Sequence, residues 1–163
     1  MKSLKLATAW LSGCSGCHMS LLNTHQGLLD ILAECELVYS PLMDIKEYPD
    51  GVDIVLIEGA VGNEENREMA LTIRQCTKVV ISLGDCAVNG NISALRNPIG
   101  LTAALEGSYG KTWGTGLTRM EALVLPLHQA IRVDAFIPGC PPDPALIGKE
   151  IAAWIKTCEK KAP

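Results

Sequence analysis

Short apolar runs alternate along the chain with longer segments in which apolar positions follow a helical period. The apolar runs are rich in β-branched residues and are bounded by glycine or proline, which is typical of strands buried on both faces of a sheet. Four runs are clear and one, at 36–40, is weaker; in chain order they are 4–10, 36–40, 52–57, 78–83 and 133–137. We therefore predict a mostly parallel sheet of five strands.

Helical patterns lie between these runs. Leucines recur on one face of residues 20–33, residues 64–75 open with acidic side chains, and a last helix begins near Pro144. Alternating strands and helices predict an α/β fold, a doubly wound sheet of flavodoxin-like type, in a single domain that spans residues 1–163. The pattern lapses in a glycine-rich loop at about residues 107–119, which we expect to move or to pack on a partner.

The composition of the chain indicates which kinds of molecule it binds and which it does not. Hydrophobic residues make up 48% of the chain and charged residues 20%, and the mean hydropathy is +0.20. With so few charges, some of the surface is expected to be covered by another protein. The net charge is −4 without a basic run, so we expect no nucleic acid and no anionic membrane surface as partner. No apolar run approaches the ~20 residues of a spanning helix, so we expect no membrane span.

The seven cysteines are an odd number in a chain long enough to fold without disulfides, and their spacing does not match a secreted disulfide framework. A reducing cytoplasm is therefore the expected compartment. Four of the seven, Cys14, Cys17, Cys86 and Cys140, closely follow a predicted strand. Because ligands of open α/β sheets bind beyond the carboxyl ends of the strands, we expect these four thiols to meet at one edge of the sheet.

Four convergent thiolates suit either tetrahedral zinc or an iron–sulfur cluster. A structural zinc site usually takes two C-x-x-C pairs, whereas only Cys14 and Cys17 form such a pair here, and this spacing favours a cluster. Gly13, Gly84 and Gly139 stand close to the cysteines, where we expect them to let backbone N–H groups point at sulfur. A zinc-stapled interaction module remains the alternative.

The C-x-x-C pair permits two further interpretations. Between a strand and a helix it has the placement of a thioredoxin-like dithiol oxidoreductase, but that function leaves Cys86 and Cys140 unexplained. A lipoprotein cleavage site before Cys14 requires an apolar segment of ~7–15 residues, and the segment at 6–11 is shorter. Cleavage at that point would also remove the first strand of the sheet.

Two side chains near the cysteines are candidates for a supporting role. Glu58 ends the third apolar run, so its carboxylate should reach the same edge, as an oxygen ligand, a proton carrier near a cluster or an acceptor of backbone N–H groups. His18 directly follows Cys17 and could donate to cluster sulfur, although a position facing solvent or a partner is the simpler expectation.

The four cysteines and Glu58 belong to four sequence motifs. These are CSGCHMS at 14–20, EGAV at 58–61, GDCAVNGNISALRN at 84–97 and IPGCPPDP at 137–144. Together they resemble the small subunit of nickel-iron hydrogenases. The resemblance implies that Cys14, Cys17, Cys86 and Cys140 bind one proximal 4Fe-4S cluster, which passes electrons from a Ni-Fe centre in a partner large subunit. It also implies that this chain does not activate hydrogen alone.

The short form of the chain indicates a subgroup of that family. Without a twin-arginine signal or a C-terminal extension carrying further clusters, it resembles most the small subunit of soluble, cytoplasmic NAD-reducing hydrogenases. The implied partners are then a hydrogenase large subunit and diaphorase subunits that carry flavin and iron–sulfur clusters. The small subunit of a membrane-anchored energy-converting hydrogenase is the alternative within this class.

Two details of the first motif distinguish the chain from relatives in the wider family. The related quinone-reductase subunit of respiratory complex I has adjacent cysteines, whereas Ser15 and Gly16 separate Cys14 from Cys17 here. Met19 stands where many hydrogenase small subunits have a glutamate, so a proton route through that carboxylate is not expected. An FMN near the cluster is suggested only by analogy with other flavodoxin-like sheets.

Overall fold

Five parallel strands form the central sheet of the computed structural model, which describes residues 3–111 and 118–161. The strands are β1 (Leu4–Trp10), β2 (Cys35–Tyr39), β3 (Val52–Glu58), β5 (Thr77–Leu83) and β7 (Ala135–Ile137). They lie in the order β2-β1-β3-β5-β7, and every neighbouring pair is parallel. This is the strand order of flavodoxin-like sheets, so the predicted fold class is confirmed.

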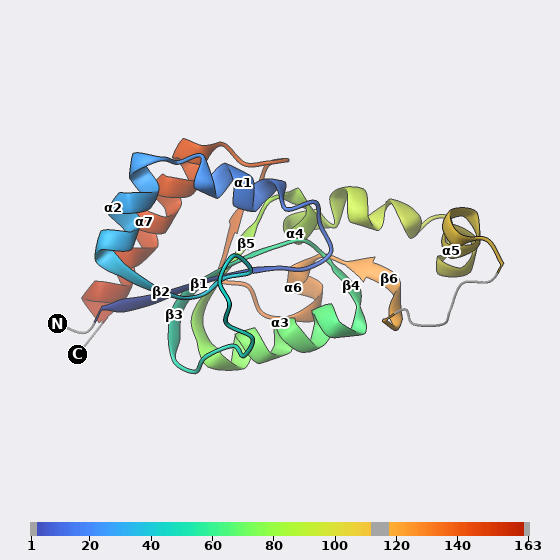
Figure 1. Cartoon of the computed structure of the whole chain (residues 1–163), viewed down its shortest axis with the longest axis horizontal. Coiled ribbons are helices and arrows are strands. Elements are labelled where there is room, and N and C mark those ends of the chain that lie inside the picture. Colours follow the sequence, from blue (N-terminus) through green and yellow to red (C-terminus); the bar gives the residue numbers. More distant parts are fainter. Residues whose placement is uncertain (1–2, 112–117, 162–163) are drawn as a thin grey trace.

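Helices cover both faces of this sheet (Figure 1). One face carries α1 (Gly16–Leu22), α2 (Gln26–Glu34) and α7 (Pro144–Lys161), and the other carries α3 (Glu64–Cys76) and α6 (Leu127–Ala130). The side chains of β3 alternate between two apolar cores, since Ile54 packs in one core with Ile147 of α7 and Val55 in the other with Ile73 of α3. Burial on both faces explains why this strand is a continuous apolar run. In the described part of the chain, no helix is long and apolar enough to cross a membrane.

Two helices occupy the segment 20–33, where one was predicted, so that prediction is wrong. The break between α1 and α2 falls at His25, a residue other than glycine with a φ of 49°. Just before it, the Thr24 hydroxyl donates to the carbonyl of Leu21 at 2.7 Å, a local bond that competes with the helical backbone pattern. The first of the two helices begins earlier than predicted, at Gly16.

A second, two-stranded sheet was not predicted from the sequence. It pairs β4 (Val61–Asn63) with β6 (Met120–Leu125) in antiparallel fashion. The remaining elements are α4 (Asp85–Asn89), the 3-10 helix η1 (Asn91–Arg96) and α5 (Leu101–Tyr109). In Figure 1, α5 and β6 lie at the end of the molecule away from α2. The predicted glycine-rich loop at 107–119 begins inside α5, and residues 112–117 of that loop lie outside the described residues.

Side chains that follow α4 hold β6 in place. Asn97 accepts the backbone N–H of Val124 and donates to the carbonyl of the same residue, both at 2.8 Å, as a neighbouring strand would. The guanidinium of Arg96 donates to the carbonyls of Gly62 at 3.1 Å and Glu121 at 2.7 Å. The segment after Cys86 is thereby fixed to the second sheet.

Candidate functional site

The four predicted cysteines all lie beyond the carboxyl ends of parallel strands. Cys14 is in the loop after β1, Cys17 is in the first turn of α1, Cys86 is in α4 directly after β5, and Cys140 follows β7. Cys14 and Cys140 are exposed, whereas Cys17 and Cys86 are half-buried. The structure therefore brings the four residues to the same edge of the sheet, as the strand positions predict.

Reciprocal hydrogen bonds join the loops that carry Cys86 and Cys140. The backbone N–H of Asp85 donates to the carbonyl of Gly139 at 2.9 Å, and the backbone N–H of Gly139 donates to Oδ1 of Asp85 at 2.7 Å. The N–H of Gly84 donates to the carbonyl of Ile137 at 2.8 Å. These bonds fix the residue before Cys86 against the residue before Cys140. Gly139 follows a different strand from Asp85, so the sequence around Asp85 alone does not reveal this contact.

Two serines connect the first cysteine motif to the other loops. The hydroxyl of Ser20, in α1, donates to the carbonyl of Pro142 at 2.5 Å, and the hydroxyl of Ser93, in η1, donates to the carbonyl of Ser12 at 2.8 Å. Ser12 also pairs with Ala60 through two backbone hydrogen bonds, of 2.8 and 3.0 Å. Every cysteine-bearing loop is thus bonded to at least one other loop at this edge.

The glycines beside the cysteines matter because they have no side chain, which leaves room for a sulfur atom and lets two loops approach closely. Gly84 has a φ of 80°, and a Cβ atom at this position would lie 2.1 Å from Sγ of Cys17. At Gly13 a Cβ would lie 3.2 Å from Cα of Gly59, so the first loop closely approaches the end of β3. The N–H groups of Gly84 and Gly139 themselves have oxygen acceptors, so neither of these two groups is directed at sulfur.

Glu58 reaches the cysteine edge, as expected, and it contacts His18. Its Oε2 atom accepts the backbone N–H of His18 at 2.6 Å. The Nδ1 atom of the His18 ring lies 2.8 Å from the same oxygen, although not at a hydrogen-bonding angle. Both residues are 2% exposed, so the prediction that His18 faces solvent or a partner is wrong. The ring packs edge-on against Trp10, with centroids 5.4 Å apart, and this contact and Glu58 keep it inside.

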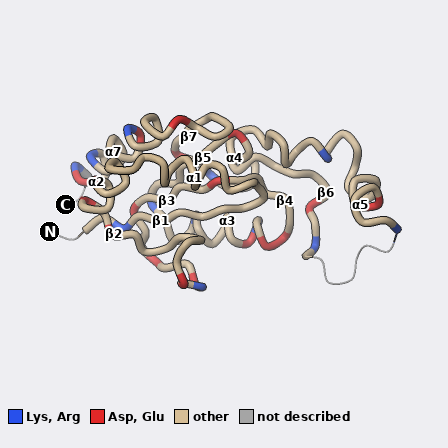
Figure 2. Tube along the Cα trace, turned by 45° about the horizontal axis from the view of Figure 1, so that its top comes forward, with Lys and Arg blue, Asp and Glu red and all other residues tan. Residues whose placement is uncertain are grey.

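The electrostatics of the edge suit a cationic occupant. Burial raises the pKa of the Cys17 thiol to about 12, and Glu58 and the other three cysteines contribute to this rise. The segments 11–20, 84–90 and 137–143 contain no lysine or arginine, and the tube in Figure 2 is largely uncharged over α1. Four thiolates in these surroundings require a positively charged group to balance them, and metal ions supply that charge.

The arrangement of the thiols also bears on the kind of metal group. In residues 3–111 and 118–161, no three His, Cys, Asp or Glu side chains are arranged to hold a single metal ion. The donor set is nonetheless the one that iron–sulfur clusters use, four thiolates, here delivered by three segments of the chain. By their chemistry, four free thiols, these residues match the donor set of a multinuclear cluster: Cys14, Cys17, Cys86 and Cys140.

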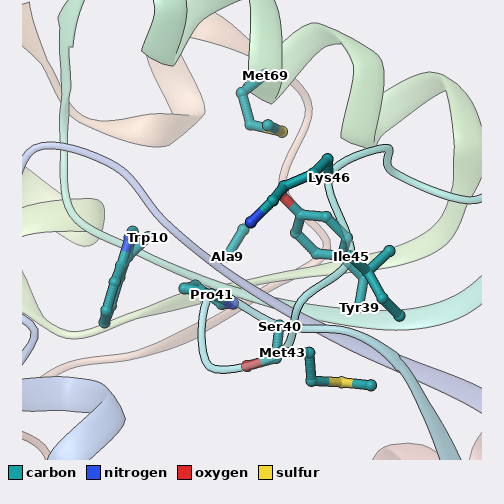
Figure 3. A pocket seen from close by; sticks show the side chains of 9 residues that line it. All are labelled: Ala9, Trp10, Tyr39, Ser40, Pro41, Met43, Ile45, Lys46 and Met69. Carbon is teal, nitrogen blue, oxygen red and sulfur yellow. The ribbon is translucent and has the colours of Figure 1, made fainter.

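An open cavity of about 300 Å³ lies at the carboxyl ends of β1 and β2, next to the cysteine edge (Figure 3). Its lining includes Trp10, Tyr39 and Lys46, and the Trp10 ring also contacts His18. The Lys46 amino group pairs with Asp44 at 2.8 Å. The Trp10 ring therefore connects the lining of the cavity to His18 of the first cysteine motif.

Comparison with known proteins identifies relatives over nearly the whole chain. The family described as the 20 kDa subunit of NADH-ubiquinone oxidoreductase matches residues 14–154. A subunit of the F420-non-reducing hydrogenase vhu of Methanocaldococcus jannaschii is 38% identical over 99% of this chain. The chain spans only 59% of the length of that relative. The delta subunit of the NAD-reducing hydrogenase HoxS of Cupriavidus necator is 36% identical over 86% of this chain and 73% of its own length.

Solved structures agree with these relatives. A chain of the crystal structure of an NAD+-reducing [NiFe]-hydrogenase in the H2-reduced state superimposes with a TM-score of 0.88 at 32% identity, covering 99% of this chain and 96% of that one. A chain of the [NiFeSe] hydrogenase from Desulfovibrio vulgaris Hildenborough has a TM-score of 0.66 at 18% identity and covers 98% of this chain and 62% of its own. The second likeness demonstrates the shared fold.

Proposed function

Since the chain belongs to the family of the 20 kDa subunit of NADH-ubiquinone oxidoreductase, we propose that it is the electron-transfer small subunit of a cytoplasmic nickel-iron hydrogenase. One 4Fe-4S cluster is bound by Cys14, Cys17, Cys86 and Cys140. The observation that carries this proposal is the convergence of these four thiols at one sheet edge, on loops bonded to each other. The relative from Cupriavidus necator and the neighbour at a TM-score of 0.88 support the hydrogenase class.

In this function the chain holds and shields the cluster, which supplies one-electron transfer when bound. The thiolates bind iron, and Gly84 leaves room for the sulfur of Cys17. The bonds between Asp85 and Gly139 keep two of the ligand loops at a constant separation, so little reorganisation accompanies the gain or loss of an electron. Hydrogen activation belongs to the Ni-Fe centre of a partner large subunit.

The electron acceptor is the finer part of the proposal. We assign the chain to an NAD-reducing assembly, in which diaphorase subunits with flavin and further iron–sulfur clusters take the electrons. The relative from Cupriavidus necator and the NAD+-reducing neighbour support this assignment. Relatives named as F420-non-reducing hydrogenases have comparable identity, and the membrane-anchored energy-converting class is the other alternative. Reduction of NAD+ by hydrogen in the purified complex supports the NAD-reducing class, whereas reduction of an artificial acceptor without any reduction of NAD+ would favour the alternatives.

The cavity of Figure 3 is a candidate position for a flavin beside the cluster. Its volume is at the lower end of the range of about 300–1,000 Å³ that ligand pockets occupy. Lys46, a cation in its lining, is paired with Asp44, so a flavin phosphate would have to displace that carboxylate. Acid extraction of the complex followed by flavin analysis tests this cofactor. More flavin than the diaphorase subunits bind supports FMN in this cavity. An amount equal to the flavin of the diaphorase subunits excludes it.

Metal analysis and low-temperature EPR of the complex, co-expressed anaerobically with its natural neighbours, test the main proposal. We expect about four iron and four sulfide per chain when the small subunit is reconstituted alone, and nickel copurifying with the complex. Serine variants of Cys14, Cys86 and Cys140 should each lose the cluster, whereas Cys76→Ser, which changes a thiol bonded to Asp50 away from the site, should keep it. The absence of both an EPR signal and nickel would refute the proposal.

The same variants distinguish the two functions of other classes. A dithiol oxidoreductase predicts that Cys86→Ser and Cys140→Ser keep their metal content while thiol exchange is lost with Cys14→Ser. A zinc-stapled module predicts colourless protein that unfolds when a chelator is added.

A further inference from the structure

Glu58 is a buried carboxylate at a position where the neighbouring strands have apolar residues. It ends β3, and its partners in register are Trp10 on β1 and Leu83 on β5. Only 2% of its surface is exposed. Burying a carboxylate in an apolar core is unfavourable by several kcal/mol unless hydrogen bonds offset it. The sheet itself gains nothing from this charge, so its role lies in what the carboxylate contacts.

The first contact is with the start of α1. That helix has no cap of its own, because Ser15 at its N-cap position makes no side-chain hydrogen bond and its first turn contains no acidic residue. The first N–H groups of a helix need acceptors from elsewhere. Glu58, which is 40 residues away in the chain, accepts the N–H of His18 at 2.6 Å. It therefore fixes the first turn of α1, which contains Cys17, to the end of β3.

The carboxylate also contacts the other end of the C-x-x-C segment. A Cβ atom at Gly13 would lie 3.8 Å from Oε1 of Glu58, so this oxygen lies beside the residue before Cys14. The nitrogen that donates to Oε2 belongs to the peptide bond between Cys17 and His18. Glu58 thus accepts the N–H that follows Cys17 and has its other oxygen near the residue before Cys14, at a depth from which solvent is excluded.

We propose that Glu58 is a positioning residue for the cluster, which holds the C-x-x-C segment against β3 and whose buried negative charge keeps the reduction potential of the cluster low. This inference rests on the proposed function. Reduction adds negative charge to a cluster, so a nearby carboxylate in a low-dielectric site opposes it. The three cysteine-bearing segments contain no lysine or arginine, and the titratable group that faces the carboxylate is the ring of His18, with Nδ1 2.8 Å from Oε2.

The test is an EPR-monitored redox titration of the full chain, reconstituted anaerobically with iron and sulfide, as wild type, Glu58→Gln and Glu58→Asp. The glutamine side chain can still accept the His18 N–H but has no charge. We therefore expect full iron content and a midpoint potential shifted to more positive values in Glu58→Gln. Glu58→Asp keeps the charge and should have a potential close to that of wild type. Glu106→Gln, which removes the same charge from an exposed position on α5, is the matched control and should not shift the potential.

Each outcome decides a separate question. If the wild-type chain takes up no cluster, the proposed function fails. If the wild type is loaded and Glu58→Gln has the same potential, the inference is overturned while the function stands. If Glu58→Gln loses iron but Glu58→Asp retains it, the positioning role is supported by rescue with a carboxylate. Loss of iron in both variants, together with loss of helical circular dichroism, would assign Glu58 to folding alone and overturn the inference.

Discussion

Among single residues, Gly84 shapes the site because it has no side chain. Its φ of 80° is in the region that residues with a side chain rarely adopt, and its hydrogen atoms face Sγ of Cys17. The space is complementary to sulfur because a Cβ atom there would approach it to 2.1 Å. A substitution as small as a methyl group would therefore move a proposed ligand.

Gly84→Ala is expected to abolish cluster binding almost completely, because the methyl group would displace Cys17. Iron per chain and visible absorbance after anaerobic reconstitution measure the loss. Gly100→Ala is a matched control, because Gly100 has a φ of 86° but nothing within 4 Å of its Cβ position. Its backbone lies in the same region of positive φ and extended ψ, which costs about 1–3 kcal/mol for a residue with a side chain, but it lacks the clash. If both variants lost iron equally, backbone strain rather than contact with sulfur would be the cause.

The position of some residues in the site could be predicted from the sequence, and that of others could not. The position of the four cysteines followed from the strand ends, since each is close in sequence to the strand that carries it. The burial of His18 could not be predicted, because it depends on Glu58 and on the Trp10 ring, which come from two different strands. The role of Gly84 was missed for the same reason, since the sulfur it accommodates belongs to another loop.

Among the elements, Asp134 is a junction between β5, α3 and the segment before β7. Its carboxylate accepts the N–H of Val80 at 2.9 Å and pairs with Arg74 at 2.6 Å. Burial alone would raise its pKa, but these two partners outweigh burial and hold the pKa below the ordinary value. The folded protein therefore binds this proton less readily than the unfolded chain does.

Asp134→Asn is expected to lower the free energy of unfolding by about 1–3 kcal/mol near neutral pH, because it removes the ion pair with Arg74. The stabilisation is fully present above the unfolded pKa of about 3.9 and is lost as the pH falls through the lower folded value. Urea unfolding at about pH 7 and about pH 3 should therefore show a difference between variant and wild type that narrows in acid. A difference independent of pH would contradict the role assigned to the charge. Asp44→Asn, at an exposed ion pair, is the control and should have little effect at either pH.

The elements with a strong local signal were predicted and those held by distant contacts were not. The strand β3 is apolar on both faces, so its sequence alone identifies it. The strand β4 has three residues and pairs with β6, which is about sixty positions later. Its partner is held in place by Asn97 and Arg96, whose backbone-like hydrogen bonds leave no periodic pattern in the sequence.

For the molecule as a whole, the surface beside the cysteine edge exposes large apolar side chains to water, which is energetically unfavourable. Ile92, Leu95 and Ile99, at and just after η1, are each 63–65% exposed. We refer to these three residues as the η1 patch. It directly follows α4, which carries Cys86, so a subunit that covers the cysteine edge would extend over it. The composition of the chain had already indicated that another protein covers part of the surface.

Leu95→Asp is expected to weaken binding of the large subunit by about 2 kcal/mol, or roughly 30-fold in affinity, because it places a charge in the centre of the η1 patch. Nickel per small subunit after affinity purification measures the effect, and the iron of the small subunit should be unchanged. Leu71→Asp, at a 44% exposed leucine on α3, is the control. Equal nickel content in both variants and wild type would place the interface elsewhere.

The distribution of the four cysteines over β1, β5 and β7 also has a consequence for biosynthesis. Cys14 leaves the ribosome early, but the set is complete only when Cys140 has been synthesised and the edge strand β7 has joined the sheet beside β5. On the proposed function, a complete cluster can therefore form only after β7 has been translated and has joined the sheet. A chain interrupted between Cys86 and Cys140 would present three of the four proposed ligands without the fourth.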